Sequence, residues 1–156
     1  MEAVAAARTF RYLPRMDTSP DSPEPSRPRY VQVDLDLHAD FPLHDLVAAF
    51  GDSVCTLHCG EGIGTGDRSA TNAYTAVLEL NLANRPLTET LRRFCNLIES
   101  LPPPAMALWK KARRREFNIG FDSGGKRPAF NTAISHQLIT RMSKLRAAVS
   151  VTIYPI

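Results

Sequence analysis

The chain has 156 residues and a net charge of +3, and it is 44% hydrophobic and 22% charged. This length accommodates one domain with one core, and the composition excludes both a wholly disordered chain and a membrane protein. No apolar run approaches the roughly 20 residues of a membrane span, and Glu2 stands where signal peptides carry positive charge, so we expect a cytoplasmic protein.

Residues 1–29 are predicted to form a proline- and serine-rich flexible leader. The stretch 17–28, DTSPDSPEPSRP, contains four prolines and almost no apolar side chains. Such a segment cannot bury enough surface to offset the entropy that is lost on ordering. We therefore place a single folded domain at residues 30–156.

The first half of this domain alternates between strand and helix patterns. Strict alternation in VQVDLDL, residues 31–37, predicts a half-buried strand. A helical period between Pro42 and Gly51 predicts a short amphipathic helix, and residues 53–59 and 74–82 are predicted as strands. The apolar positions behind these predictions are Val31, Val33, Leu35, Leu37, Leu43, Leu46, Val47, Phe50, Ala76, Leu78, Leu80 and Leu82, whereas Val77 faces outward.

Two helices are predicted after Pro86, separated by the prolines at 102–104. A strand over 115–122, a turn at 123–128, a helix that Ser135 caps, and a last strand over 148–154 complete the chain. The buried faces are predicted to comprise Leu87, Leu91, Phe94, Ile98, Leu101, Met106, Trp109, Ala112, Phe117, Ile119, Phe121, Ile139, Met142 and Leu145.

The predicted order β-α-β-β-α-α-β-α-β favours an α+β domain, in which helices pack on one face of a single mixed or mostly antiparallel sheet. Together the segments AVLEL, LTETLRRFCNLIESL, FNIGFDSG, ISHQLITRMSKL and VSVTIYP resemble a family of small bacterial domains known only as a domain of unknown function. The resemblance covers roughly residues 31–155 and implies the same fold, but it brings no catalytic residues.

The glycine-rich stretch 60–66 does not have the pattern of a phosphate-binding loop. Its glycines follow a G-x-G-x-G-x-G spacing, no Lys-Ser or Lys-Thr follows, and the next predicted element is a strand. A hairpin connection explains the glycines better, and Gly62 and Gly64 are candidates for contact with a partner.

Cys55, His58 and Cys59 are close in sequence but do not favour a zinc site. On a regular strand the two cysteines share a face at a separation of about 13 Å, and the histidine points to the other face. No second pair of ligands completes a tetrahedron. Cys55 and Cys59 are predicted to be small buried thiols, and all three cysteines, in a chain without an export signal, are predicted to be reduced.

Asp34, Asp36 and His38 lie on the polar side of the first strand, with Glu79 and Asn81 as suggested cross-strand neighbours. Such a group can hold a hard metal or perform acid–base chemistry. A polar sheet face that prevents aggregation is the interpretation we favour, so no metal or cofactor is expected.

The charge is distributed asymmetrically. Residues 30–104 carry ten acidic and four basic side chains, a net −6, whereas residues 105–156 carry two acidic and ten basic ones, a net +8. Within WKKARRRE a basic helix over 110–115 is predicted, and it is a candidate for binding either nucleic acid or an acidic protein surface. Its basic residues are Lys110, Lys111, Arg113, Arg114 and Arg115.

The sequence therefore predicts a non-catalytic binding module whose partner is another protein, as in accessory or immunity-type proteins. Self-association into a homo-oligomer is compatible with the uneven charge. The alternatives are a nucleic-acid-binding protein that uses the basic 110–115 segment and a metal-dependent enzyme built on Asp34, Asp36 and His38.

Overall fold

The computed structural model describes residues 29–62, 73–81, 85–123 and 130–155. Several predictions lie outside these described residues. They concern the leader up to residue 28, the loop residues 63–72 with Gly64, the inward position of Leu82, and the turn beyond Ser123.

The order of elements along the chain is β-α-β-β-α-α-β-α-β, which confirms the prediction. A single 3-10 turn at Gly51–Ser53 follows the first helix, and Gly51 has a φ of 56°, which favours glycine. The elements are β1 (Arg29–Ala39), α1 (His44–Ala48), β2 (Val54–Glu61), β3 (Tyr74–Leu80), α2 (Leu87–Glu99), α3 (Pro103–Lys111), β4 (Arg114–Asp122), α4 (His136–Lys144) and β5 (Ala148–Tyr154).

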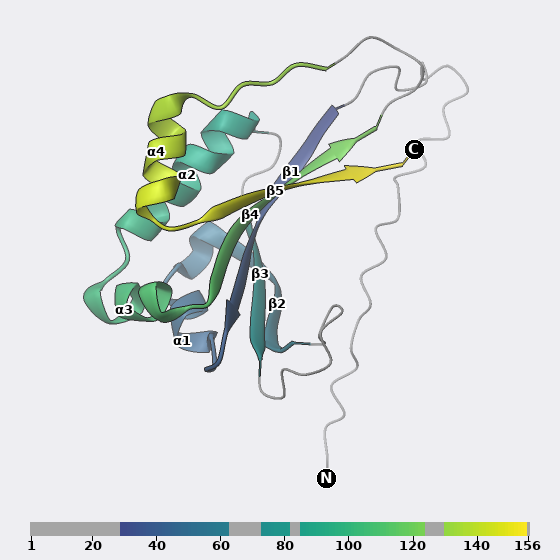
Figure 1. Cartoon of the computed structure of the whole chain (residues 1–156). Helices are drawn as coiled ribbons and strands as arrows, with labels where there is room; N and C mark the ends of the chain where they lie inside the picture. The colour runs from purple at the N-terminus through teal and green to yellow at the C-terminus, as the bar shows by residue number, and fades with distance from the viewer. Residues whose placement is uncertain (1–28, 63–72, 82–84, 124–129, 156) are drawn as a thin grey trace.

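The strands form one five-stranded sheet in the order β2-β3-β1-β4-β5. All neighbouring pairs are antiparallel except β4 and β5, which run parallel. The four helices lie on the same side of the sheet (Figure 1). We call this side the helical face and the opposite side the open face, which no helix of the described residues covers. The predicted α+β class is thereby confirmed.

The core fills the space between the helical face and the helices. Alternation along β1 places Val33, Leu35 and Leu37 there, each almost fully buried. Phe94 on α2 packs against Phe117 on β4 with ring centroids 5.7 Å apart. The buried apolar stripe predicted for α2, which runs from Leu87 through Leu91, Phe94 and Ile98 to Leu101, is confirmed.

Trp109 connects α3 to the end of α4. Its ring is buried, and its indole Nε1–H donates to the backbone oxygen of Leu145 at 3.1 Å. A buried indole N–H needs such a partner, because an unpaired donor in the core costs free energy. This bond helps to position the turn between α4 and β5. The predicted burial of Trp109 and Ala112 is confirmed.

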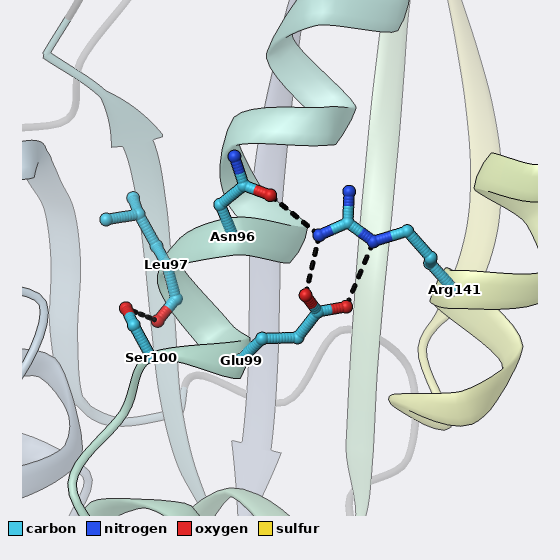
Figure 2. Close-up of polar contacts among 5 residues, drawn as sticks. All are labelled: Asn96, Leu97, Glu99, Ser100 and Arg141. Carbon is cyan, nitrogen blue, oxygen red and sulfur yellow. Dashed lines mark hydrogen bonds and ion pairs between the residues drawn. The ribbon is translucent and has the colours of Figure 1, made fainter.

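Helix α4 begins as predicted and buries Met142 as predicted, but Ile139 is not part of its buried face. The Ser135 hydroxyl accepts from the backbone N–H of Leu138, so Ser135 is the N-cap. Leu138 and Met142 are buried, whereas Ile139 is 52% exposed, so the predicted burial of Ile139 was wrong. Burial of Leu138 and Met142 turns Ile139 away from the core, and on the side of α2 Arg141 bonds to Glu99 and Asn96 (Figure 2).

Candidate functional site

The open face carries rows of polar side chains across the sheet. Asp34 on β1 lies opposite Glu79 on β3 and Asn118 on β4, and Asp36 lies opposite Glu116 on β4. The predicted pairing of Asp34 with Glu79 is therefore confirmed. Asn81 lies after the end of β3, where its side-chain nitrogen donates to the backbone oxygen of Asp52, so Asn81 does not join these rows.

The carboxylates of the open face are crowded and partly desolvated. Burial raises the pKa of Asp36 to about 6, and the negative charges of Asp34 and Glu116 add to that effect. Burial also raises the pKa of Asp34, against the lowering effect of a hydrogen bond from Gln32. The pKa of Glu79 is raised by burial and by the charge of Asp34. Partial burial and the repulsion between neighbouring acids therefore both disfavour their charged forms.

Glu116 is the most buried of these acids and has the most partners. Its Oε2 accepts from Nε of Arg114 at 2.9 Å and from Nη2 of the same guanidinium. Burial raises its pKa, but hydrogen bonds from Ser150 and Arg114 and the charge of Arg114 lower the pKa overall. Glu116 and Asn118 were not among the predicted site residues. The alternation of REFNIGFD could have identified both, since it places their side chains on the face of the strand that Phe117 and Ile119 do not occupy.

His38 stands at one end of the open face. The β1 register places it between Thr75 on β3 and Arg114 on β4. Burial lowers the pKa of His38, and the positive charge of Arg114 lowers it further. Among the residues that the structure describes, no group of three or more His, Cys, Asp or Glu side chains is arranged to hold a metal ion. The described geometry thus gives no ligand set at Asp34, Asp36 and His38.

A β-bulge changes the expected arrangement of Cys55, His58 and Cys59. The register between β2 and β3 shifts between Thr56 and His58, so Cys55 and His58 now lie on the open face, opposite Glu79 and Val77. Cys59 lies on the helical face. The prediction that the two cysteines share a face was wrong, because the inserted residue reverses the alternation.

The predicted burial of Cys55 was wrong, and that of Cys59 is confirmed only in part. Cys95 is fully buried, and burial raises its pKa to about 11. Cys59 is half-buried, whereas Cys55 is exposed on β2. All three thiols are free.

The basic residues 110–115 do not form one helix. Helix α3 ends at Lys111 and β4 begins at Arg114, so the predicted basic helix over 110–115 is wrong. The chain leaves the helix because Ala112 adopts an extended ψ of 138°. Arg113 Nη1 pairs with Asp40 Oδ1 at 2.6 Å.

Arg115 points back to the end of α3. Its Nη1 donates to the backbone oxygens of Trp109 at 2.8 Å and Lys110 at 3.0 Å, and its Nε donates to that of Arg146 at 3.2 Å. Its guanidinium thus satisfies carbonyls that a helix C-terminus leaves unpaired. The Lys111 ammonium lies 4.9 Å from the ring centre of Phe41. Several residues of the predicted basic surface therefore form contacts with other parts of the same domain.

Gly62 has a structural reason to be glycine. Its backbone N–H donates to the oxygen of Ala73 at 2.7 Å, where the two strands of the hairpin meet. A Cβ at this position would lie 2.7 Å from Thr75 Cγ2 and 3.3 Å from the oxygen of Ala73. A partner contact through Gly62 stays a prediction.

The edge strand β5 exposes an apolar row. Val149, Val151 and Ile153 lie opposite Phe117, Ile119 and Phe121 of β4 and so share the helical face. Their partners on β4 are mostly buried, yet the three side chains are 44%, 57% and 65% exposed. Among the described residues, no strand pairs with the outer edge of β5. We call these three residues the apolar row.

The backbone N–H and C=O groups of the apolar row point away from β4, toward the outer edge of the sheet. The N–H of Ser123, just after β4, donates to the backbone oxygen of Tyr154 at 2.9 Å. The peptide groups of Tyr154 therefore face β4, and those of Thr152 and Ser150 do the same, because N–H and C=O groups alternate in direction along a strand. The N–H and C=O groups of the apolar row consequently face outward.

Two hollows flank the apolar row. One, of about 530 Å³, lies beside Val149 and is lined by Ile139, Met142 and Arg146 among others. The other, of about 470 Å³, lies beside Ile153 and is lined by Phe121, Asp122 and Phe130 among others. Together with the row they form one candidate docking surface, which we call the β5 surface.

Comparisons of the chain with family models, with curated proteins and with solved structures each found no match. The resemblance to the bacterial family of unknown function therefore stays a prediction. No helix within the described ranges is long and apolar enough to cross a membrane. The cytoplasmic location also stays a prediction, and the function has to be argued from the geometry of this chain.

Proposed function

We propose that the protein is a non-catalytic protein-binding module and that its binding site is the β5 surface. The observation that carries this proposal is the combination of an apolar row and outward peptide groups on one edge strand. An added strand would bond to the peptide groups, and its own apolar side chains would cover the row. No reactive group or cofactor is required for this function.

The composition of β5 supports the proposal. Edge strands are usually protected against pairing by charged residues, prolines or bulges. The sequence of β5, AVSVTIY, contains no charged residue and no proline. The opposite edge strand, β2, contains a bulge after Thr56 and ends at Glu61. Protection of one edge but not of the other is typical of a sheet that accepts a partner on one side.

The free energy gained by covering the apolar row also favours a bound partner. Covering the exposed half of an aliphatic side chain contributes about 1 kcal/mol, so each residue of the row favours a partner by about that amount. Large apolar patches on single chains are often functional surfaces. Ile139, on the neighbouring helix α4, extends the apolar surface beside Val149.

Site-specific photocrosslinking tests the proposal. A photoreactive amino acid at position 151 should form an adduct with a protein in the native cells, because the side chain of Val151 lies inside the β5 surface. The same amino acid at Asp45, which is exposed on α1, is the control and should give no specific adduct. Equal labelling at both positions, or no protein adduct at position 151, would contradict the proposal.

A further inference from the structure

We propose that the protein that occupies the β5 surface is a second copy of this chain. The two β5 strands pair antiparallel about a two-fold axis at Val151 and join the two sheets into one. This inference rests on the proposed function and names its partner. Three features of the β5 surface support it: the direction of its peptide groups, the order of its side chains and the charges in its hollows.

The direction of the peptide groups fits a symmetric pair. In an antiparallel pair, residues that exchange both backbone bonds alternate with residues that exchange none. A two-fold axis at Val151 places Val151 opposite the partner's Val151 and Val149 opposite the partner's Ile153. These residues have outward peptide groups, as the bond from Ser123 to Tyr154 determines, so each pair can exchange both bonds.

The side chains are also self-complementary under the same axis. On the helical face, the apolar row of one copy lies beside the apolar row of the other, since the row is centred on Val151. On the open face, Ser150 lies opposite the partner's Thr152, so polar groups meet polar groups. A register shifted by one residue would place outward peptide groups opposite inward ones and lose these bonds.

The charges of the two hollows are complementary. Arg146 is the one charged residue among the described residues that line the hollow beside Val149. Asp122 is the one charged residue among those that line the hollow beside Ile153. Because the axis brings Val149 of one copy to the partner's Ile153, it places the hollow lined by Arg146 next to the partner's hollow lined by Asp122. Asp122 also accepts a hydrogen bond from Arg29, at 3.1 Å, within its own chain.

The size of the surface sets the expected strength of the dimer. A stable interface buries roughly 800 Å² on each partner, which is more than a single strand edge provides. Ile139, which is 52% exposed beside the row, and the two hollows must therefore also be covered. Helix α4 lies on the same face as the row, so the α4 helices of the two copies flank the joint between the sheets. We expect a dimer that dissociates on dilution.

Sedimentation equilibrium over a range of protein concentrations is the first test. The wild-type protein should shift from monomer to dimer as its concentration rises, and Val151→Glu should weaken dimerisation at least tenfold. Leu57→Glu is the matched control, because Leu57 is 50% exposed on the opposite edge strand, and it should leave dimerisation unchanged. Circular dichroism and a melting temperature show whether each variant is folded. Equal weakening by both variants would contradict the proposal.

Cysteine crosslinking in a Cys55→Ser background tests the register. Val151→Cys should form a disulfide-linked dimer under mild oxidation, because paired Cα atoms in an antiparallel ladder lie about 5.5 Å apart, within the range for a disulfide. Val149→Cys alone should not crosslink, since its opposite residue is the partner's Ile153. A mixture of Val149→Cys and Ile153→Cys chains should crosslink. Crosslinking of Val149→Cys alone, or no crosslinking at Val151→Cys, would overturn this arrangement.

Failure of this inference can be distinguished from failure of the proposed function. A protein that is monomeric at all concentrations, but whose position 151 photocrosslinks to a different protein, overturns the dimer and keeps the binding function. A monomer without any adduct at position 151 overturns both. A monomer in which the amides of the apolar row are already protected from exchange shows that a segment of the same chain occupies the edge, and it also overturns the dimer.

Discussion

Arg141 on α4 binds the Glu99 carboxylate on α2 through two parallel hydrogen bonds, from Nε to Oε1 at 3.0 Å and from Nη2 to Oε2 at 2.6 Å (Figure 2). The same Nη2 donates to Asn96 Oδ1 at 2.7 Å. On the same helix, Ile139 lines the hollow beside β5. The ion pair thus joins α2 to the helix that borders the β5 surface.

Arg141→Ala should lower the free energy of unfolding by about 1 kcal/mol, because it removes a bidentate but partly exposed ion pair. Arg92→Ala, at an exposed position of α2, is the control and should change stability by less than about 0.5 kcal/mol. Because the bonds from Arg141 lower the pKa of Glu99, the difference between wild type and Arg141→Ala should be present above pH 4.5 and decline as the pH falls further. Urea denaturation at several pH values measures it, and a difference that does not depend on pH would contradict this account.

Asp36→Asn should stabilise the protein at pH 7. The pKa of Asp36 is raised from 3.8 to about 6, so the folded state binds more protons than the unfolded state between these values, and stability falls as the pH rises through that window. Allowing for solvent screening, the substitution should recover about 1 kcal/mol at pH 7 and nothing below pH 3.8. The lowered pKa of His38 acts in the opposite direction, because the folded state binds this proton less readily and stability therefore falls as the pH drops below 6.5. This effect of His38 is present in both wild type and Asp36→Asn. Thermal melts from pH 3 to 8 check the result, and a variant that is less stable at pH 7 would refute the explanation.

Gly62→Ala should destabilise the hairpin between β2 and β3 by about 1–3 kcal/mol, since the new methyl group would lie 2.7 Å from Thr75 Cγ2. Combining it with Thr75→Ala should recover much of the loss, because the clashing methyl group is removed. Gly60→Ala is the control, since its Cβ would meet nothing nearer than 3.9 Å. Chemical denaturation of the three variants measures the effect, and equal losses for Gly60→Ala and Gly62→Ala would contradict the close approach.

Arg115→Ala should lower stability by about 2 kcal/mol, because the backbone oxygens of Trp109, Lys110 and Arg146 lose a charged donor. Lys110→Ala should have little effect, since only the backbone of Lys110 takes part in these bonds. Urea denaturation of the two variants compares them directly. If Lys110→Ala were as costly as Arg115→Ala, the assigned role of Arg115 would be wrong.

The elements that could be predicted from the sequence are those with one buried face, because their apolar residues recur at the spacing of a strand or a helix. The alternation in β1 and the stripe from Leu87 to Ile98 on α2 depend on local spacing, so both could be read directly. The order of elements then limited the fold to one sheet with helices on one face. The polar rows of the open face were predicted only in part, since finding Glu116 beside Asp36 requires the register between β1 and β4.

The features that were missed depend on interactions between distant residues. The bulge after Thr56 reverses the faces of His58 and Cys59, and no local pattern marks it. The face of α4 that is buried depends on its packing against the rest of the domain, which includes a contact with Glu99 on another helix. The alternation of AVSVTIY identifies a strand, but whether Val151 is covered depends on where α4 lies above the sheet. Alternating apolar residues on a strand give the same sequence pattern whether their side chains are buried in the core or exposed for a partner.

Hydrogen exchange at the Val151 amide, followed by NMR at low and high protein concentration, tests the central claim most directly. The Val151 N–H faces outward and the Thr152 N–H faces β4, so in dilute protein Val151 should exchange quickly and Thr152 slowly. At high concentration the Val151 amide should slow by at least tenfold, while that of Thr152 changes little. A Val151 amide that exchanges at the same rate at every concentration would contradict the account.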